Sequence, residues 1–169
     1  GNSLASASPL AAQTAGRTHK LEASPTTVAY GFYSPTATPA LRIASGDIVE
    51  VTTMLTNTPE RLERAGLAPN DVEPELREIV SQVTDKGPGG HILTGPVYVE
   101  GAEPGDVLEV EILSISLPID YGYNGCKGFL PQNCEQDAPF KVLTLDRKRM
   151  TSEFLPGIVI PLRPFFGSM

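Results

Sequence analysis

The chain has 169 residues and a mass of 18.0 kDa, which is the size of one ordinary domain. Apolar residues make up 40% and charged residues 20% of the sequence, so a fully disordered or collagen-like chain is excluded. The formal charge of −7 argues against nucleic-acid and anionic-membrane partners, and no apolar stretch approaches the roughly 20 residues of a membrane span.

The first fifteen residues are small and polar, without a hydrophobic period, and we expect residues 1–25 to be a flexible N-terminal segment. They resemble the tract around a secretory cleavage site, although a basic region and an apolar region before it are missing. A mature periplasmic or secreted protein fits this pattern, and the alternative location is the cytoplasm.

Residues 26–169 alternate short apolar segments with turns, and we expect them to form one β domain. Segments around Leu41 and Ile48 are separated by Ser45-Gly46-Asp47, which indicates a hairpin turn. The pattern returns about 59 residues later at Pro104-Gly105-Asp106, again before an apolar segment that contains Glu. The repeat records either a duplicated β unit or a common solution for a tight turn, and the sequence alone leaves both open.

Two short helices are expected to interrupt the strands. Thr58 can cap the first helix, with Pro59 at its first position. Asp71 can cap a second helix within residues 71–83, because apolar residues recur there at i, i+3, i+4 and i+7. The apolar residues on this face are Leu76, Ile79, Val80 and Val83.

The chain then returns to strands, which we expect at 91–93, 97–99, 107–116, 141–145 and 158–162. The loop after residue 117 contains Cys126 and Cys134, which form a disulfide in an oxidising compartment and remain thiols in the cytosol. The expected fold is mainly β, a β-sandwich or a partly open barrel with one or two inserted short helices.

The last thirteen residues, GIVIPLRPFFGSM, combine an apolar strand with an aromatic pair. Nothing after them covers the apolar surface that they would expose. We therefore expect residues 158–169 to pack against a second polypeptide segment or an identical subunit.

The segment KGPGGH is the most suggestive one for chemistry, although it lacks the Gly-Lys-Ser/Thr ending of a phosphate-binding loop. It places His91 at the start of a strand, six residues after Asp85. The two side chains can converge as metal ligands or as a base with its orienting acid. Each also has an ordinary structural interpretation, His91 as a hydrogen-bonded histidine that supports the turn and Asp85 as a turn carboxylate.

Other candidate sites are weaker. Glu100, Glu103 and Asp106 cluster around a turn rich in Gly, Pro and Ala, which indicates a solvated turn rather than an acid–base pair. A blue-copper site would need two His and a Cys close together, and no His closely follows either Cys. No motif of a nucleophilic serine is present.

The segment HILTGPVYVEGAEPGDVLEVEI strongly resembles the acetamidase/formamidase family of amide hydrolases. The similarity includes His91, Thr94-Gly95-Pro96 and Pro104-Gly105-Asp106, and it resumes at MTSEFLPGIVIPLRPFFGSM. The earlier GFYSPTATPALRIASGDIVEVTT is similar to the opening strands of the family. The resemblance covers about residues 28 to 169 and corresponds to the N-terminal half of the family's chain.

The resemblance implies a mostly β fold and the hydrolysis of formamide or acetamide to ammonia and a carboxylate. It also implies oligomers and a divalent metal ion, zinc or calcium. Asp85 and His91 match the Asp and His around the family's Gly-Pro turn, so they are the expected catalytic and metal-binding residues. Gly89 and Gly90 are the expected substrate-binding residues, because their N–H groups can approach a developing oxyanion closely.

The chain departs from the family pattern at two points. Ala29 stands where relatives often have His, and the Gly-Asp-His motif of the family's second half is not found in this sequence. We expect turnover of the amide substrate to require that second half. The alternative function is a non-catalytic β-rich binding or structural module, in which His91 only supports a turn.

Overall fold

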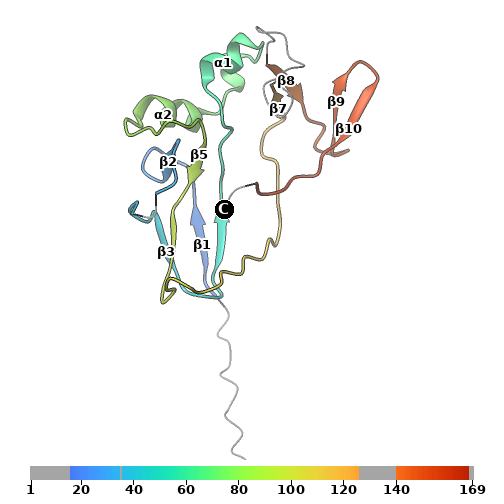
Figure 1. Ribbon diagram of the computed structural model, residues 1–169. Coiled ribbons are helices and arrows are strands. Elements are labelled where there is room, and N and C mark those ends of the chain that lie inside the picture. The colour runs from blue at the N-terminus through green and yellow to red at the C-terminus, as the bar shows by residue number, and fades with distance from the viewer. Residues whose placement is uncertain (1–15, 35, 126–139, 168–169) are drawn as a thin grey trace, which may run out of the picture.

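The computed structural model describes residues 16–34, 36–125 and 140–167. Strands dominate this part of the chain, and all of its helices lie between β4 and β5 (Figure 1). The predicted mainly β fold with inserted short helices is confirmed. The elements are β1 (Thr18–Leu21), β2 (Val28–Tyr30), β3 (Leu41–Ile43), β4 (Ile48–Val51), α1 (Pro59–Arg64), the 3-10 helix η1 (Pro69–Asp71), α2 (Pro74–Gln82), β5 (Ile92–Thr94), β6 (Val97–Val99), β7 (Tyr121–Asn124), β8 (Lys141–Thr144), β9 (Thr151–Leu155) and β10 (Ile158–Pro161).

The described strands pair two by two, in five two-stranded sheets. β1 runs parallel to β4 and β3 runs parallel to β6, whereas β2–β5, β7–β8 and β9–β10 are antiparallel. The predicted hairpin across residues 45–47 is wrong, because β3 and β4 on its two sides pair with different strands. Within the described residues the strands do not close into a barrel.

The helical insertion largely follows the prediction. Thr58 occupies the position before α1 as predicted, but its side chain makes no capping hydrogen bond. Pro59 occupies the first turn, where a missing N–H costs no hydrogen bond. α2 is the longest helix in the described ranges and lies within residues 71–83, as predicted. The predicted cap is wrong, because Glu73 precedes α2 and Asp71 belongs to η1.

The core lies between the helical insertion and the strands next to it. Leu62 of α1 and both Leu76 and Ile79 of α2 are completely buried. Burial of one such side chain contributes about 1.5–3 kcal/mol relative to exposure, so these faces attach the insertion to the strands. The cluster of buried residues consists of Ala23, Tyr30, Met54, Leu62, Val72, Leu76, Ile79, Ile92 and Tyr121.

The ordered fold begins earlier than the expected boundary at residue 25. β1 pairs with β4, and Leu21 and Ala23 are only 4% and 5% exposed. Residues 18–25 are therefore part of the β domain, which corrects the expectation that they are flexible. Residues 1–15 lie outside the described residues.

Asp47 connects β1 to the turn before β4. Its carboxylate accepts the Ala44 N–H at 3.0 Å and the Arg17 N–H at 2.8 Å, and its Oδ2 lies 2.8 Å from His19 Nε2. The bond from Ala44 and then that with His19 are the largest causes that lower the pKa of Asp47 to about 2. The ionised carboxylate therefore stabilises this end of the β1–β4 pair.

The turn at Asp106 repeats the hydrogen bonds of the turn at Asp47. In both turns the Asp N–H bonds the carbonyl three residues earlier, and the Asp carboxylate accepts that residue's N–H. The earlier residue is Ala44 in one turn and Glu103 in the other. The repeated sequence thus builds the same turn twice, followed by β4 in the first case and by an unpaired segment in the second.

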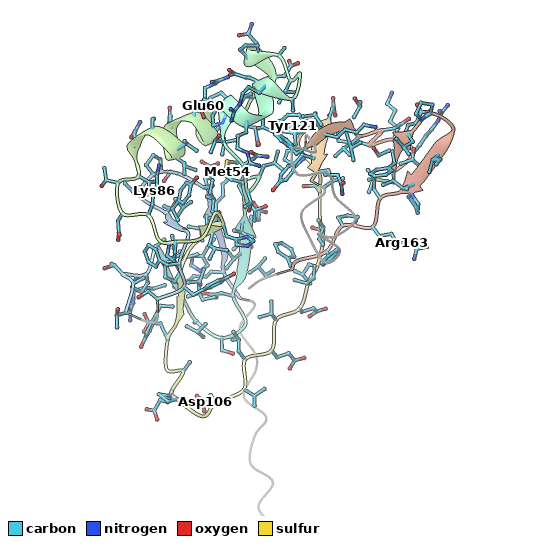
Figure 2. The ribbon with its side chains drawn as sticks, turned by 45° about the horizontal axis from the view of Figure 1, so that its top comes forward. Met54, Glu60, Lys86, Asp106, Tyr121 and Arg163 are labelled. Carbon is cyan, nitrogen blue, oxygen red and sulfur yellow. The ribbon has the colours of Figure 1, made fainter. Side chains whose placement is uncertain are left out.

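Residues 107–116 do not form the strand that their sequence predicts. They pair with no strand in the described part of the chain, and their backbone bonds no other described backbone group. Their large apolar side chains are exposed, from Val107 at 94% to Ile115 at 36%. The segment runs as a plain trace from the turn at Asp106 toward β7 (Figures 1 and 2). An alternating pattern makes a strand only where a neighbouring edge accepts its hydrogen bonds.

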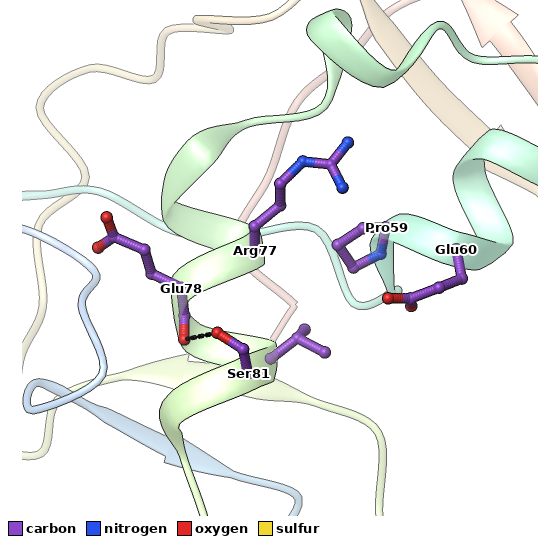
Figure 3. A pocket seen from close by; sticks show the side chains of 6 residues that line it. Pro59, Glu60, Arg77, Glu78 and Ser81 are labelled. Atoms are coloured by element: carbon purple, nitrogen blue, oxygen red, sulfur yellow. Dashed lines mark hydrogen bonds between the residues drawn. The ribbon is translucent and has the colours of Figure 1, made fainter.

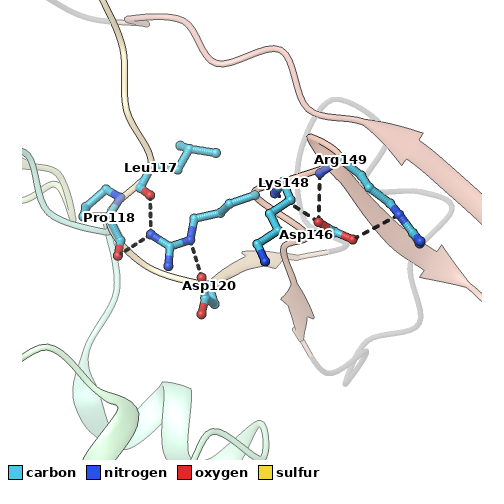
Figure 4. Close-up of polar contacts among 7 residues, drawn as sticks. Leu117, Pro118, Asp120, Asp146, Lys148 and Arg149 are labelled. Atoms are coloured by element: carbon cyan, nitrogen blue, oxygen red, sulfur yellow. Dashed lines mark hydrogen bonds and ion pairs between the residues drawn. The ribbon is translucent and has the colours of Figure 1, made fainter.

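Arg147 holds the end of this unpaired segment near β8 (Figure 4). Its Nη1 donates to the carbonyls of Leu117 and Pro118 at 2.9 and 3.0 Å, and its Nε pairs with the Asp120 carboxylate. These contacts fix the place where the chain leaves the exposed segment and enters β7.

The remaining predictions fall partly inside and partly outside the described residues. The strands expected at 91–93, 97–99, 141–145 and 158–162 are confirmed as β5, β6, β8 and β10. Cys126 and Cys134 lie outside the described residues, so their disulfide stays a prediction. In the parts of the chain that the structure describes, no helix is both long and apolar enough to cross a membrane.

We predict that Asp47→Asn removes part of the pH dependence of stability. Because the folded-state pKa is about 2 against an ordinary 3.8, the carboxylate stabilises the fold above about pH 4, and this contribution is lost as the pH falls through about 2. The wild type should have the larger free energy of unfolding at about pH 5, and the difference should shrink toward about pH 2. Urea titrations followed by circular dichroism measure both values.

Asp106→Asn is the matched control, because it removes the same carboxylate charge from a turn that precedes no paired strand of the described residues, while the amide oxygen can still accept the Glu103 N–H. It should change the free energy of unfolding less than Asp47→Asn does. The lowered pKa of Asp47 would be contradicted if wild type and Asp47→Asn differed in free energy of unfolding as much at about pH 2 as at about pH 5.

Candidate functional site

Residues 85–91 connect α2 to β5 and follow the backbone of Tyr30 and Gly31 at the end of β2. The Gly87 N–H donates to the Tyr30 carbonyl at 2.8 Å, and the Gly89 N–H donates to the Gly31 carbonyl at 3.0 Å. We call this segment the glycine loop. Its course is fixed by backbone hydrogen bonds to a strand that lies far away in the sequence.

The approach of the two backbones requires glycine. A Cβ on Gly31 would lie 2.4 Å from the Gly89 oxygen, and a Cβ on Gly87 would lie 2.4 Å from the Gly31 oxygen. Gly31 also has a φ of +80°, a conformation that strains any residue with a side chain. Both positions therefore exclude larger residues, by contact at Gly87 and by contact and conformation at Gly31.

Lys86 anchors the start of the glycine loop on the end of α2 (Figure 2). Its Nζ donates to the Val80 carbonyl at 2.6 Å and lies 4.9 Å from the centroid of the Tyr30 ring. A cation at the C-terminal end of a helix is favourable, because it meets the negative end of the helix dipole. Lys86 thereby joins α2, the loop and β2.

The structure places the predicted residues Asp85 and His91 at the two ends of the glycine loop, both with exposed side chains. The His91 carbonyl accepts the Gly31 N–H at 2.7 Å, which fixes the His91 backbone at the entrance to β5. The imidazole thus faces solvent from a fixed backbone. Such a position suits a residue that exchanges protons with a small substrate.

One of the two predicted oxyanion donors is already engaged, which corrects that part of the prediction. The Gly89 N–H bonds the Gly31 carbonyl, so it cannot also point at a substrate. The Gly90 N–H has no backbone acceptor within the described residues, and a Cβ on Gly90 would meet only the Thr56 methyl carbon, at 3.8 Å. Gly90 is therefore the better donor candidate of the pair.

The described residues do not complete a metal site. Among residues 16–34, 36–125 and 140–167, no group of three or more His, Cys, Asp and Glu side chains can hold an ion. Zinc sites use three or four protein ligands and calcium sites more. Asp85 and His91 alone therefore do not fit a divalent metal, whose further ligands would have to come from outside the described residues.

Thr56 and Tyr123 lie near the glycine loop and were not predicted from the sequence. The Tyr123 hydroxyl donates to the Thr56 carbonyl at 2.5 Å, and its ring packs edge-on against Phe140 with centroids 5.6 Å apart. Burial raises the pKa of Tyr123, so the hydroxyl stays a neutral donor. The two residues are 67 positions apart, so no local sequence signal could have joined them.

A pocket of about 430 Å³ lies between the two helices (Figure 3). Its Arg77 already has an anionic partner, because its Nη2 donates to the Glu63 carboxylate and to the Pro69 carbonyl. The residues that line the pocket are Pro59, Glu60, Arg77, Glu78, Val80 and Ser81, and none of the predicted site residues is among them. We assign this pocket no part in amide chemistry.

We predict that Gly31→Ala displaces the glycine loop. The change adds both a strained φ and a contact of 2.4 Å with the Gly89 oxygen, so it should lower the free energy of unfolding and shift the amide resonances of residues 87–91. Gly101→Ala is the control, because Gly101 has a φ of +78° and no atom within 4 Å of its Cβ position. Equal losses of stability in both variants, with unshifted loop resonances, would contradict the prediction.

Comparison with known proteins places the chain in a family. No curated protein matches the chain. The model of the Acetamidase/Formamidase family matches residues 34–169, which is more than half of the sequence and includes the whole glycine loop. Because this match covers most of the sequence, including His91 at the entrance to β5, the chain belongs to the acetamidase/formamidase family.

Proposed function

We propose that this chain takes part in the hydrolysis of short linear amides, such as formamide and acetamide, to ammonia and a carboxylate. Membership of the family supports amide hydrolysis as the class of reaction. The observation that carries the proposal is the exposed imidazole of His91, on a backbone that is fixed by the bond between its carbonyl and Gly31.

Amide hydrolysis forms a C–O bond from water and breaks the C–N bond, and the departing nitrogen must gain a proton. In the proposed site, His91 takes a proton from the attacking water and returns it to the leaving nitrogen. The Gly90 N–H donates to the oxyanion. No ion pair joins Asp85 to His91 among the described residues, so an orienting role for Asp85 requires its carboxylate to move toward the imidazole. The products are then ammonia and the carboxylic acid, which ionises.

The proposed site includes groups from outside the described residues. Asp85, His91 and Gly90 lack the third ligand that a zinc or calcium ion would need. The divalent metal therefore belongs to the proposal only together with further ligands, and we assign it no step. Because the described residues do not complete a metal site, we propose that amide turnover requires the second half of the family pattern.

Residues 158–169 are proposed to pack against a second polypeptide segment or an identical subunit. Ile158 and Val159 of β10 are 51% and 60% exposed, and Phe165 is 82% exposed. Covering these side chains would remove exposed apolar area from water. Phe165→Ser should therefore weaken this packing. It should lower the mass in analytical ultracentrifugation if an identical subunit covers Phe165, or the free energy of unfolding of the complete protein if a second segment does. No change in either quantity would contradict the proposal.

We predict that His91→Ala lowers amide turnover by on the order of 10²-fold or more, as expected for the loss of a proton-transfer group. The melting temperature should move little, because the His91 side chain is exposed. Ammonia release from formamide and acetamide by the complete protein measures turnover, and thermal denaturation measures stability.

His19→Ala is the matched control, since the chain has two histidines and His19 is bonded to Asp47. It should lower stability and leave turnover nearly unchanged, which is the opposite of His91→Ala. Addition and removal of a chelator tests the metal. Wild-type turnover in His91→Ala at saturating formamide and supplied metal would return His91 to a supporting role and favour the non-catalytic module.

A further inference from the structure

The exposed segment 107–111 is the counterpart of β4 in the repeated sequence. IVEV follows the turn at Asp47 and VLEV follows the turn at Asp106, so Val107 corresponds to Ile48 and Glu109 to Glu50. The two turns have the same hydrogen bonds, and the two segments therefore leave their turns in comparable ways. Only β4 has a partner among the described strands.

The partner of β4 shows what such a segment can bind. β1 runs parallel to it, and Lys20 of β1 lies opposite Glu50. The Ile48 N–H donates to the Arg17 carbonyl at 2.8 Å, and the Thr52 N–H donates to the Leu21 carbonyl at 3.0 Å. β4 is thus satisfied by an extended segment that contains a basic residue opposite its glutamate.

The corresponding edge of segment 107–111 is free within the described residues. Val107 is 94% exposed, against 39% for its counterpart Ile48, and Leu108 is 69% exposed. Residues 100–117 contain no Lys or Arg, so all charged side chains of this tract are acidic. The edge is apolar, acidic and without a described hydrogen-bond partner.

We propose that residues 107–111 bind an extended protein segment that adds in parallel, with a Lys or Arg opposite Glu109. Charge complementarity favours this occupant, because Glu109 and Glu111 are the charged groups of the segment and opposite charges across neighbouring strands attract. A second copy of the same edge would bring glutamates together on chains that each have a net charge of −7. The proposal concerns an interaction surface and does not depend on amide hydrolysis.

The test uses two synthetic peptides and the full chain labelled with ¹⁵N. The first peptide copies residues 16–23, GRTHKLEA, and the second replaces its Lys by Glu. We expect the first peptide to shift the amide resonances of residues 107–111, with a Kd about threefold or more below that of the second. The difference should decrease at high salt, because the pair is exposed to solvent.

Three variants make the test specific. Glu109→Gln should reduce the difference in Kd between the two peptides, whereas Glu50→Gln should not, because Glu50 lies on β4, which is already paired with β1. Val107→Pro keeps every charge and removes the N–H that corresponds to that of Ile48, so it should abolish binding. Its melting temperature should stay near the wild-type value, because the Val107 side chain is exposed.

Several outcomes would overturn the proposal. These are no shift of residues 107–111 at millimolar peptide, equal binding of both peptides, or unchanged binding by Val107→Pro. Sedimentation of the chain alone provides the remaining arm. A dimer that Val107→Pro dissociates would identify a second copy as the occupant, and the proposal of a basic partner segment would then be wrong.

Discussion

The close approach between Gly31 and the glycine loop is the constraint on which the rest of the candidate site depends. Two peptide backbones lie so near each other that a single added carbon would overlap a carbonyl oxygen. The bond from Gly31 to the His91 carbonyl continues the β2–β5 ladder into the loop. This contact fixes the position of the loop relative to β2. It thereby also fixes where the chain leaves α2 and where it enters β5.

The same contact explains why an exposed His91 can have a defined position. Exposed side chains in loops usually share the mobility of their backbone. Here the backbone on one side of His91 enters a strand, and its carbonyl is bonded to Gly31. Lys86 restrains the opposite end of the loop through Val80 and Tyr30. Exposure and order are therefore combined at the residue that the proposed chemistry needs.

The sequence predicted the features that depend on local pattern and missed those that depend on distant pairing. Periodicity located α2, whose Leu76 and Ile79 are completely buried. It missed β1, because the sequence Thr-His-Lys-Leu does not alternate clearly and its order comes from pairing with β4. It predicted a strand at 107–116 from a good pattern, but a pattern does not supply a neighbouring edge.

The candidate site shows the same division. The Gly-Pro-Gly-Gly run indicated a tight loop before His91, and the family resemblance selected His91 and Asp85. The role of Gly31 could not be predicted, because a glycine after a strand gives no sign of which distant backbone it will meet. For the same reason, the engagement of the Gly89 N–H became visible only once β2 and the loop were placed together.

The parallel pairing of β3 with β6 has a consequence for how the chain tolerates change. Leu41 pairs with Val97, so the whole helical insertion lies inside the stretch of chain that this pair closes. The entropy of closing a loop grows only with the logarithm of its length, and doubling the length costs about 0.6 kcal/mol. Lengthening the insertion at an exposed position such as the turn between α1 and η1 would therefore change the closure of β3 on β6 very little. The packing of the buried helix faces, rather than the length of the chain, therefore limits which insertions this region tolerates.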